Sequence, residues 1–284
     1  MIAGKPSETA LHTAAARAAH HRFDPEPHLL EDTAAADLLG PGAEGLMKLY
    51  QDDGPWVLVE NRIFVPLRTR YVEDRLHIAH REGARQYVVL GAGLDSFAFR
   101  QPMALQDIEV FEIDHPSTQS WKMARIEELG WIVPENVHFI ECDFEKGPVS
   151  VALRETEFDP SVRSVLCWMG VVYYLTKETV ANTLADLATL LADGSEVVLD
   201  YMRPWEELSP RYLELRDTMA KYLDGAGEPQ ISRYRRDELL RVIHDAGYAH
   251  AHTEDRQSLF ERYIRPIHSA VPLSERFGLA VATR

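Results

Sequence analysis

Five short apolar segments alternate with helical segments through the middle of the chain, and this alternation limits the fold more than any other feature of the sequence. Segments that are apolar throughout predict strands covered on both faces of a sheet. Strand, helix and strand in succession predict a parallel, doubly wound α/β sheet with right-handed crossovers. The predicted strands are QYVVLGAG (86–93), IEVFEIDHP (108–116), VHFIECDF (137–144), VRSVLCWMG (162–170) and SEVVLDYM (195–202).

Helical patterns flank this region on both sides. Pro66 is expected to break or kink one of the early helices near Val65, because proline removes a hydrogen bond inside a helix. The flanking elements that we predict are helices over 7–22, 28–40 and 61–84, a helical insertion over 203–230, a helix over 235–248, and strands over 249–255 and 275–284.

Charge and hydropathy exclude some partners. The formal net charge of −15 over 284 residues argues against a nucleic-acid partner, which needs a basic face. The longest apolar run, 165–175, is far shorter than the roughly 20 residues of a membrane span, and we see no secretory leader. We therefore expect a soluble, cytoplasmic protein without a membrane partner, and the sequence leaves its oligomeric state open.

The first predicted strand ends in a glycine turn that brings backbone close to a ligand. Gly91 and Gly93 begin a Gly-x-Gly pattern, but Ser96 stands where a dinucleotide fingerprint has its third glycine. Asp95 in the same turn would repel a diphosphate and suits an ammonium or sulfonium group. Its alternative role is to cap the helix that follows.

Two further acidic residues follow the next strands. Asp114 ends the second strand, where a carboxylate accepts hydrogen bonds from ribose hydroxyls. Asp143 and Phe144 end the third, where a carboxylate and a ring suit an adenine. A nucleoside with a cationic arm and no phosphate is S-adenosylmethionine, which we predict as the cofactor.

Several segments resemble the leucine carboxyl methyltransferase-like superfamily, in its bacterial branch of class I S-adenosylmethionine-dependent O-methyltransferases. The resemblance implies a Rossmann-like, seven-stranded, mostly parallel sheet whose antiparallel strand is ERFGLAVATR. It also implies that Arg68 binds the methionine carboxylate of the cofactor, with Arg70 as a weaker candidate. The matching segments are SETALHTAAARAA, LRTRYVEDRL, YVVLGAGLDSFAFR, FEIDHPSTQSWK, MGVVYYL and GSEVVLDY.

One position departs from the family pattern. The family usually has a glutamate before the glycine of its EGVLMYL-like segment, and this chain has Met169. Backbone carbonyls around Cys167 and Trp168 are candidates for the lost contact to the cofactor's ammonium group.

We expect one domain over 1–284, with an N-terminal helical part (1–85), a cofactor-binding core (86–201), a helical lid (202–236) and a C-terminal helix and strands (237–284). The Gly225–Gly227 loop would let the lid move. We expect the lid to cover a small, anionic, partly aromatic methyl acceptor. The candidate acceptor-binding residues are Tyr173, Tyr174, Tyr201, Arg203 and Arg233.

We identify no catalytic base, because His115, His244, His250 and His252 read as structural or exposed. His77 and His80 lack a third ligand, so no metal is expected. A carboxylate acceptor needs no base, so methyl ester formation is favoured over methylation of a hydroxyl. The alternatives are a nucleotide-dependent oxidoreductase and a non-catalytic protein that binds the cofactor.

Overall fold

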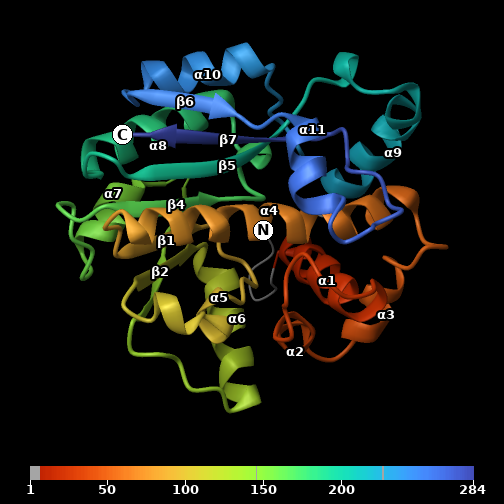
Figure 1. Cartoon of the computed structure of the whole chain (residues 1–284), viewed down its shortest axis with the longest axis horizontal. Helices are drawn as coiled ribbons and strands as arrows, with labels where there is room; N and C mark the ends of the chain where they lie inside the picture. The colour runs from red at the N-terminus through yellow and green to blue at the C-terminus, as the bar shows by residue number, and fades with distance from the viewer. Residues whose placement is uncertain (1–6, 145, 226) are drawn as a thin grey trace.

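The computed structural model describes residues 7–144, 146–225 and 227–284, and its centre is one seven-stranded sheet (Figure 1). The strand order is β3-β2-β1-β4-β5-β7-β6, and β7 is the antiparallel strand, paired with β5 and β6. The predicted mostly parallel α/β sheet is confirmed, including its antiparallel strand. The strands are β1 (Gln86–Leu90), β2 (Glu109–Asp114), β3 (Val137–Glu141), β4 (Ser164–Trp168), β5 (Glu196–Met202), β6 (His250–Thr253) and β7 (Phe277–Thr283).

Helices pack on both faces of the sheet and at one end of it, where α1 to α3 gather in Figure 1. The helices are α1 (Glu8–Phe23), α2 (Ala35–Leu39), α3 (Ala43–Lys48), α4 (Trp56–Arg81), α5 (Phe97–Arg100), α6 (Pro116–Leu129), α7 (Val149–Arg154), α8 (Lys177–Leu190), α9 (Pro210–Gly225), α10 (Arg236–Asp245) and α11 (Arg256–Leu259). Short 3₁₀ turns cover Met103–Leu105, Val172–Tyr174 and Trp205–Glu207, and a π turn covers Phe260–Ile264.

Strand β1 shows why the sheet is covered twice. Val88 and Leu90 join an apolar core with α7, α8 and α10, whereas Tyr87 and Val89 join a second core with α4 and α5. Successive side chains of a strand point to opposite faces, so a continuous apolar segment can be buried only between two layers.

Two sequence predictions about the N-terminal helices are wrong in part. The expected helix over 28–40 is limited to α2, because residues 28–34 form a loop tied down by side chains. A break at Pro66, one of the two outcomes expected there, does not occur, since α4 runs through this residue without interruption. Burial of Ile63, Phe64 and Leu67 against the sheet offsets the hydrogen bond that the proline removes.

In the described part of the chain, every helix is too short or too polar to span a bilayer. The division of the chain into one domain with a lid stays a prediction.

Candidate functional site

A cavity of about 600 Å³ lies at the carboxyl ends of the parallel strands. Its walls come from the segments that follow β1, β2, β3 and β4, together with the start of α1 and residues 227–231. The sequence-predicted site residues that line it are Arg68, Gly91, Gly93, Asp95, Asp114, Asp143, Phe144, Met169 and Tyr174.

The glycine turn presents bare backbone to the cavity. Gly91 has a φ of +69°, and a Cβ atom there would lie 2.3 Å from Cγ2 of Val171. Only glycine adopts this conformation at little cost and leaves this space free. Asp95 accepts a hydrogen bond at 2.8 Å from the amide of Phe97, the first residue of the short helix α5, and it also lines the cavity.

Asp114 is fixed by the backbone around it. Its carboxylate accepts hydrogen bonds from the amide of Gly93 and, at 2.6 Å, from the amide of His115. Burial raises the pKa of Asp114, although these two bonds oppose the shift. The carboxyl group is therefore oriented toward the cavity before any ligand arrives.

Asp143 and Phe144 follow β3 on the next wall. The Asp143 carboxylate lies 2.8 Å from the Lys146 ammonium and 3.6 Å from Nε2 of His115. His115 also caps α6, because its Nδ1 accepts from the Ser117 amide. These contacts give His115 a structural position, as predicted from the sequence.

Arg68 reaches the cavity from α4 beside the turn at Gly170. Its Nη1 donates to Asp200 at 2.5 Å and to the Tyr173 hydroxyl at 3.1 Å. Burial by itself would lower the pKa of Arg68, but Asp200 and Tyr173 raise it by more than burial lowers it. The net pKa is therefore raised, and the side chain remains a cation. A Cβ atom on Gly170 would lie 2.8 Å from Nη2 of Arg68, so this glycine leaves room for the guanidinium.

The sequence analysis missed Asp200, although it is an acid inside an otherwise apolar strand. It is fully buried and also accepts from the Gly170 amide at 2.7 Å. A carboxylate from β5 therefore lies beside the turn where Met169 replaces the family's glutamate.

The sequence analysis also missed helix α1 as a wall of the cavity. Arg17 donates to Asp32 at 2.7 Å and to the Leu94 carbonyl at 2.6 Å, which ties α1 to the glycine turn. Ser96 donates to the same Asp32 at 2.7 Å. Ser96 at the third fingerprint position thus has a structural partner that glycine could not provide.

Residues 227–231 form part of the cavity wall. The Glu228 carboxylate accepts from the Thr9 amide at 3.0 Å, at the start of α1, and the Ile231 amide donates to the Tyr173 carbonyl at 2.8 Å. Ala226, within the loop expected to move, lies outside the described residues. The preceding helix α9 buries only Tyr212 and Leu223, which is little attachment for its length.

Other predicted residues lie away from the cavity lining. Trp168 is fully buried in the sheet core, and the Tyr201 ring packs over the backbone of Gly278. Tyr173 lies behind the wall and contributes its hydroxyl to Arg68.

Arg203 and Arg233 also lie outside the lining of this cavity, and their contact with an acceptor stays a prediction. Arg203 donates to the Glu275 carbonyl and pairs with Glu207 at 3.3 Å. Arg233 stacks on Trp205, with its guanidinium carbon 3.8 Å from the ring centroid. Both cations therefore already have partners, in the insertion and, for Arg203, also in the segment before β7.

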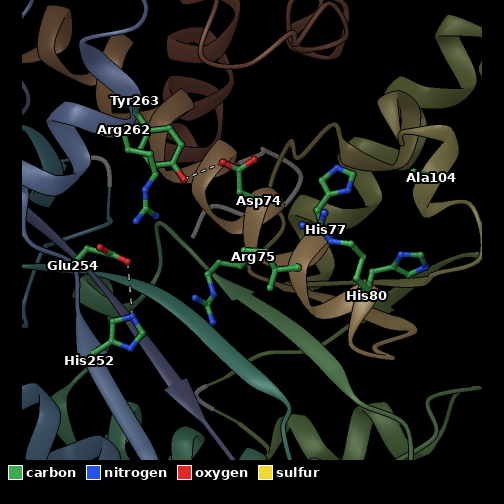
Figure 2. A pocket seen from close by; sticks show the side chains of 11 residues that line it. Asp74, Arg75, His77, His80, Ala104, His252, Glu254, Arg262 and Tyr263 are labelled. Carbon is green, nitrogen blue, oxygen red and sulfur yellow. Dashed lines mark hydrogen bonds and ion pairs between the residues drawn. The ribbon is translucent and has the colours of Figure 1, made fainter.

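A second hollow of about 870 Å³ lies between the end of α4 and strand β6. Figure 2 shows His252 and Glu254 on one wall and His77 and His80 on the other, with Arg75 between them. Its charges are paired locally: Tyr263 donates to Asp74 at 3.0 Å, and His252 lies 3.8 Å from Glu254. The histidines do not converge, so this hollow has no metal-like geometry.

The smaller cavity fits a nucleoside with a cationic arm better than a dinucleotide. Asp95, Asp114 and Asp143 all line it, at three successive strand ends. Three carboxylates oppose a diphosphate and accept hydrogen bonds from hydroxyl and amino groups. The bare backbone at Gly91 gives such a ligand close access.

Comparison with known proteins also points to a nucleoside with a cationic arm. The sequence model of the family described as leucine carboxyl methyltransferase matches residues 10–188. The chain belongs to this family. It is an S-adenosylmethionine-dependent methyltransferase, as predicted, and membership of the family removes the oxidoreductase alternative.

Individual relatives agree. YktD of Bacillus subtilis, which its name places among the S-adenosyl-L-methionine-dependent methyltransferases, is 30% identical over 92% of this chain and 93% of its own. A Thermobifida fusca structure, also named as a methyltransferase, superposes with a TM-score of 0.62 at 15% identity, over 99% of this chain and 96% of its own. The magnesium protoporphyrin IX methyltransferase of Synechocystis PCC 6803, with bound SAH, has a TM-score of 0.50 at 11% identity, over 86% of this chain and 94% of its own. At these identities the two structures show the shared fold.

Proposed function

We propose that the protein transfers a methyl group to an oxygen of a small anionic acceptor, and to a carboxylate more readily than to a hydroxyl. The cofactor, when bound, supplies a methyl group already activated on a sulfonium. The protein then has to position and align the acceptor, and to provide a base only where the acceptor is a poor nucleophile.

Residues of the cavity would hold the cofactor as follows. Asp114 accepts from the ribose hydroxyls, and Asp143 with Phe144 holds the adenine. Arg68, with Asp200 and Tyr173 fixing its position, binds the methionine carboxylate from the Gly170 side.

The preference for a carboxylate rests on the side chains that line the cavity where we place the acceptor, which we call the acceptor wall. Val171, Leu175, Pro229 and Ile231 give it an apolar surface. Burial raises the pKa of Tyr174 to about 12, so this phenol keeps its proton at neutral pH. A carboxylate acceptor is ionised already and needs no proton removed.

A buried cation close enough to Tyr173 and Tyr174 to feel their charge supports an anionic acceptor. Five lysine or arginine side chains are buried in the described part of the chain: Arg17, Arg62, Arg68, Lys122 and Arg276. Four of them pair with a carboxylate, and Arg276 does not, within 4.0 Å. Its Nη2 donates to Asn61 at 2.9 Å, and its Nε has no partner.

Burial lowers the pKa of Arg276, which reflects the cost of a charge without a counter-ion. Arg276 also contacts Met219 of α9, at 3.6 Å from Nη1 to the sulfur. Opening of α9 would uncover this cation for an acceptor anion. Arg276 thus takes the role that the sequence analysis had given to Arg203 and Arg233.

The test is methyl transfer from labelled S-adenosylmethionine to a panel of aromatic and aliphatic acids, phenols and alcohols, with the neutral amides of the acids. We expect acids to be methylated and their amides not, and mild alkali to release the label from the product as methanol, as it does from esters but not ethers. An alkali-stable product would contradict the carboxylate preference. Absence of turnover with intact cofactor binding would support the non-catalytic alternative.

Arg276 has its own test. Arg276→Met should lower turnover of acids at least tenfold while the folded protein stays as stable or gains stability, because a buried unpaired charge is removed. Arg203→Met is the matched control and should leave turnover unchanged. Equal turnover in wild type and Arg276→Met would refute the role of this cation and leave the methyltransferase assignment intact.

A further inference from the structure

A cluster of histidines lies where helix α1 ends and the next loop begins, and the cofactor cavity does not include it. His21 is in the last turn of α1, and His28 and Glu31 are in the loop that follows. Their nitrogen and oxygen ligand atoms all lie within 4.8 Å of one another. In the described part of the chain, these are the three metal-ligating side chains that converge in this way.

The hydrogen bonds of His28 determine which of its nitrogens carries a proton. Its Nε2 lies 3.0 Å from the carbonyl oxygen of Asp24, which can only accept, so Nε2 carries the hydrogen and donates. In a neutral ring, Nδ1 then presents a lone pair. That lone pair faces the Glu31 carboxylate at 3.2 and 3.3 Å.

The lone pair on Nδ1 of His28 and those on the Glu31 carboxylate repel each other at this distance unless a cation lies between them. A carboxylate has no hydrogen to donate, and Glu31 also faces Nε2 of His21 at 3.3 Å. Either an extra proton on the rings or a metal ion satisfies the arrangement. A metal ion satisfies both imidazoles and the carboxylate at once.

The spacing matches a zinc site. Ligand atoms around a tetrahedral zinc lie roughly 3.3–3.6 Å apart, because Zn–N and Zn–O bonds are about 2.0–2.2 Å. Oε2 of Glu31 lies 3.3 Å from Nδ1 of His28 and 3.3 Å from Nε2 of His21, at the lower end of this range. Two imidazoles and one carboxylate form a known zinc ligand set that leaves a fourth position for water.

The surroundings already orient these ligands. The His28 side chain is 6% exposed, and its bond to the Asp24 carbonyl is the kind of outer contact that fixes a metal-binding histidine. His20, fully buried, contacts Asp24 at 2.8 Å and accepts from the Leu29 amide at 2.9 Å, which holds both ends of the loop. His28 would therefore lose little side-chain entropy on binding.

We propose that His21, His28 and Glu31 bind one divalent transition-metal ion of the zinc class, as a clasp between α1 and the 24–34 loop. Glu31 directly precedes Asp32, the acid that holds Arg17 and Ser96 beside the glycine turn. Binding would stabilise the helical wall of the cofactor cavity without entering it. A metal at this cluster would differ from the sequence expectation of no metal, which did not consider His21 and His28.

The test is calorimetric titration of the chelator-treated full-length protein with zinc chloride at pH 7.5, alongside its thermal unfolding. We expect one ion per chain, a rise in the unfolding temperature, and weaker binding at pH 5.5, where protons compete for the imidazoles. Cobalt(II) should give the visible absorption of a four-coordinate ion.

Variants locate the site. His21→Asn and Glu31→Gln change exposed or half-exposed side chains, so folding should survive, and each should weaken zinc binding at least tenfold. His77→Asn and His252→Asn, in the other hollow, are matched controls that should bind as wild type does. No saturable binding in the wild type, or binding that survives both His21→Asn and Glu31→Gln, would overturn the proposal.

Discussion

Substitution of Gly91 by alanine tests how the glycine turn is built. A Cβ atom at Gly91 would lie 2.3 Å from Cγ2 of Val171, at a φ of +69°. The left-handed conformation costs alanine about 1–2 kcal/mol. Overpacking against Val171 adds about 1–3 kcal/mol. We therefore expect Gly91→Ala to lower the free energy of unfolding by about 2–5 kcal/mol and to weaken cofactor binding.

Two further variants separate these causes. Gly130 has a φ of +66° and nothing within 4 Å of its would-be Cβ, so Gly130→Ala should show the conformational cost alone. Adding Val171→Ala to Gly91→Ala removes the methyl group that clashes and should restore about 1–3 kcal/mol.

Urea unfolding gives the free energies, and calorimetric titration with S-adenosylmethionine gives the affinities. If Gly91→Ala costs no more than Gly130→Ala, or if the added Val171→Ala restores nothing, then Gly91 is not in close contact with the wall at Val171. The reasoning about the turn would then be refuted.

Three other changes have defined outcomes. Because burial raises the pKa of Asp114, the unliganded protein should lose stability as the pH rises from the ordinary pKa of an aspartate through the raised pKa of Asp114, and the cofactor affinity measured by calorimetry should increase over the same pH interval. Asp114→Asn should remove both trends. If the variant keeps them, another group causes them. Arg68→Lys should weaken S-adenosylmethionine binding by roughly 10- to 100-fold, because the forked contact is lost, but should hardly affect a decarboxylated analogue; an equal loss with that analogue would mean that Arg68 acts elsewhere. Tyr222→Phe removes the hydrogen bond between the Tyr222 hydroxyl and Nε2 of His12, so it should speed amide hydrogen exchange in α9. The control is Tyr248→Phe, which should leave this exchange unchanged because the Tyr248 hydroxyl has no hydrogen-bond partner. Unchanged exchange in both variants would show that the bond to His12 does not hold α9 in place.

The strands and their succession along the chain could be predicted because each strand has a local signature. Apolar segments such as YVVL and SVLCW have no polar face, and each is followed by a helix. Of the break or kink expected at Pro66, the break does not occur. A proline penalty is a local quantity, whereas the burial that offsets it depends on the sheet below α4.

Some residues of the candidate site could likewise be predicted from local sequence, and others could not. Acids at strand ends were predictable, because parallel strands bring their carboxyl ends to one edge. Asp200 and Arg276 were not, because an acid within a strand or an arginine before one has no local pattern. Their roles come from partners that are far along the chain, Arg68 for the first and Asn61 for the second.

The sequence by itself determined the layered α/β fold, the cofactor class and the glycine turn, because each depends on residue types at short, fixed spacings. Only the tertiary structure decided which cations have a carboxylate or aromatic partner and which do not. Arg203 and Arg233 looked available in the sequence, but Glu207 and Trp205 occupy them, while Arg276 is buried without a carboxylate. The availability of a charge depends on the groups that pack around it, and packing brings together residues that the sequence keeps far apart.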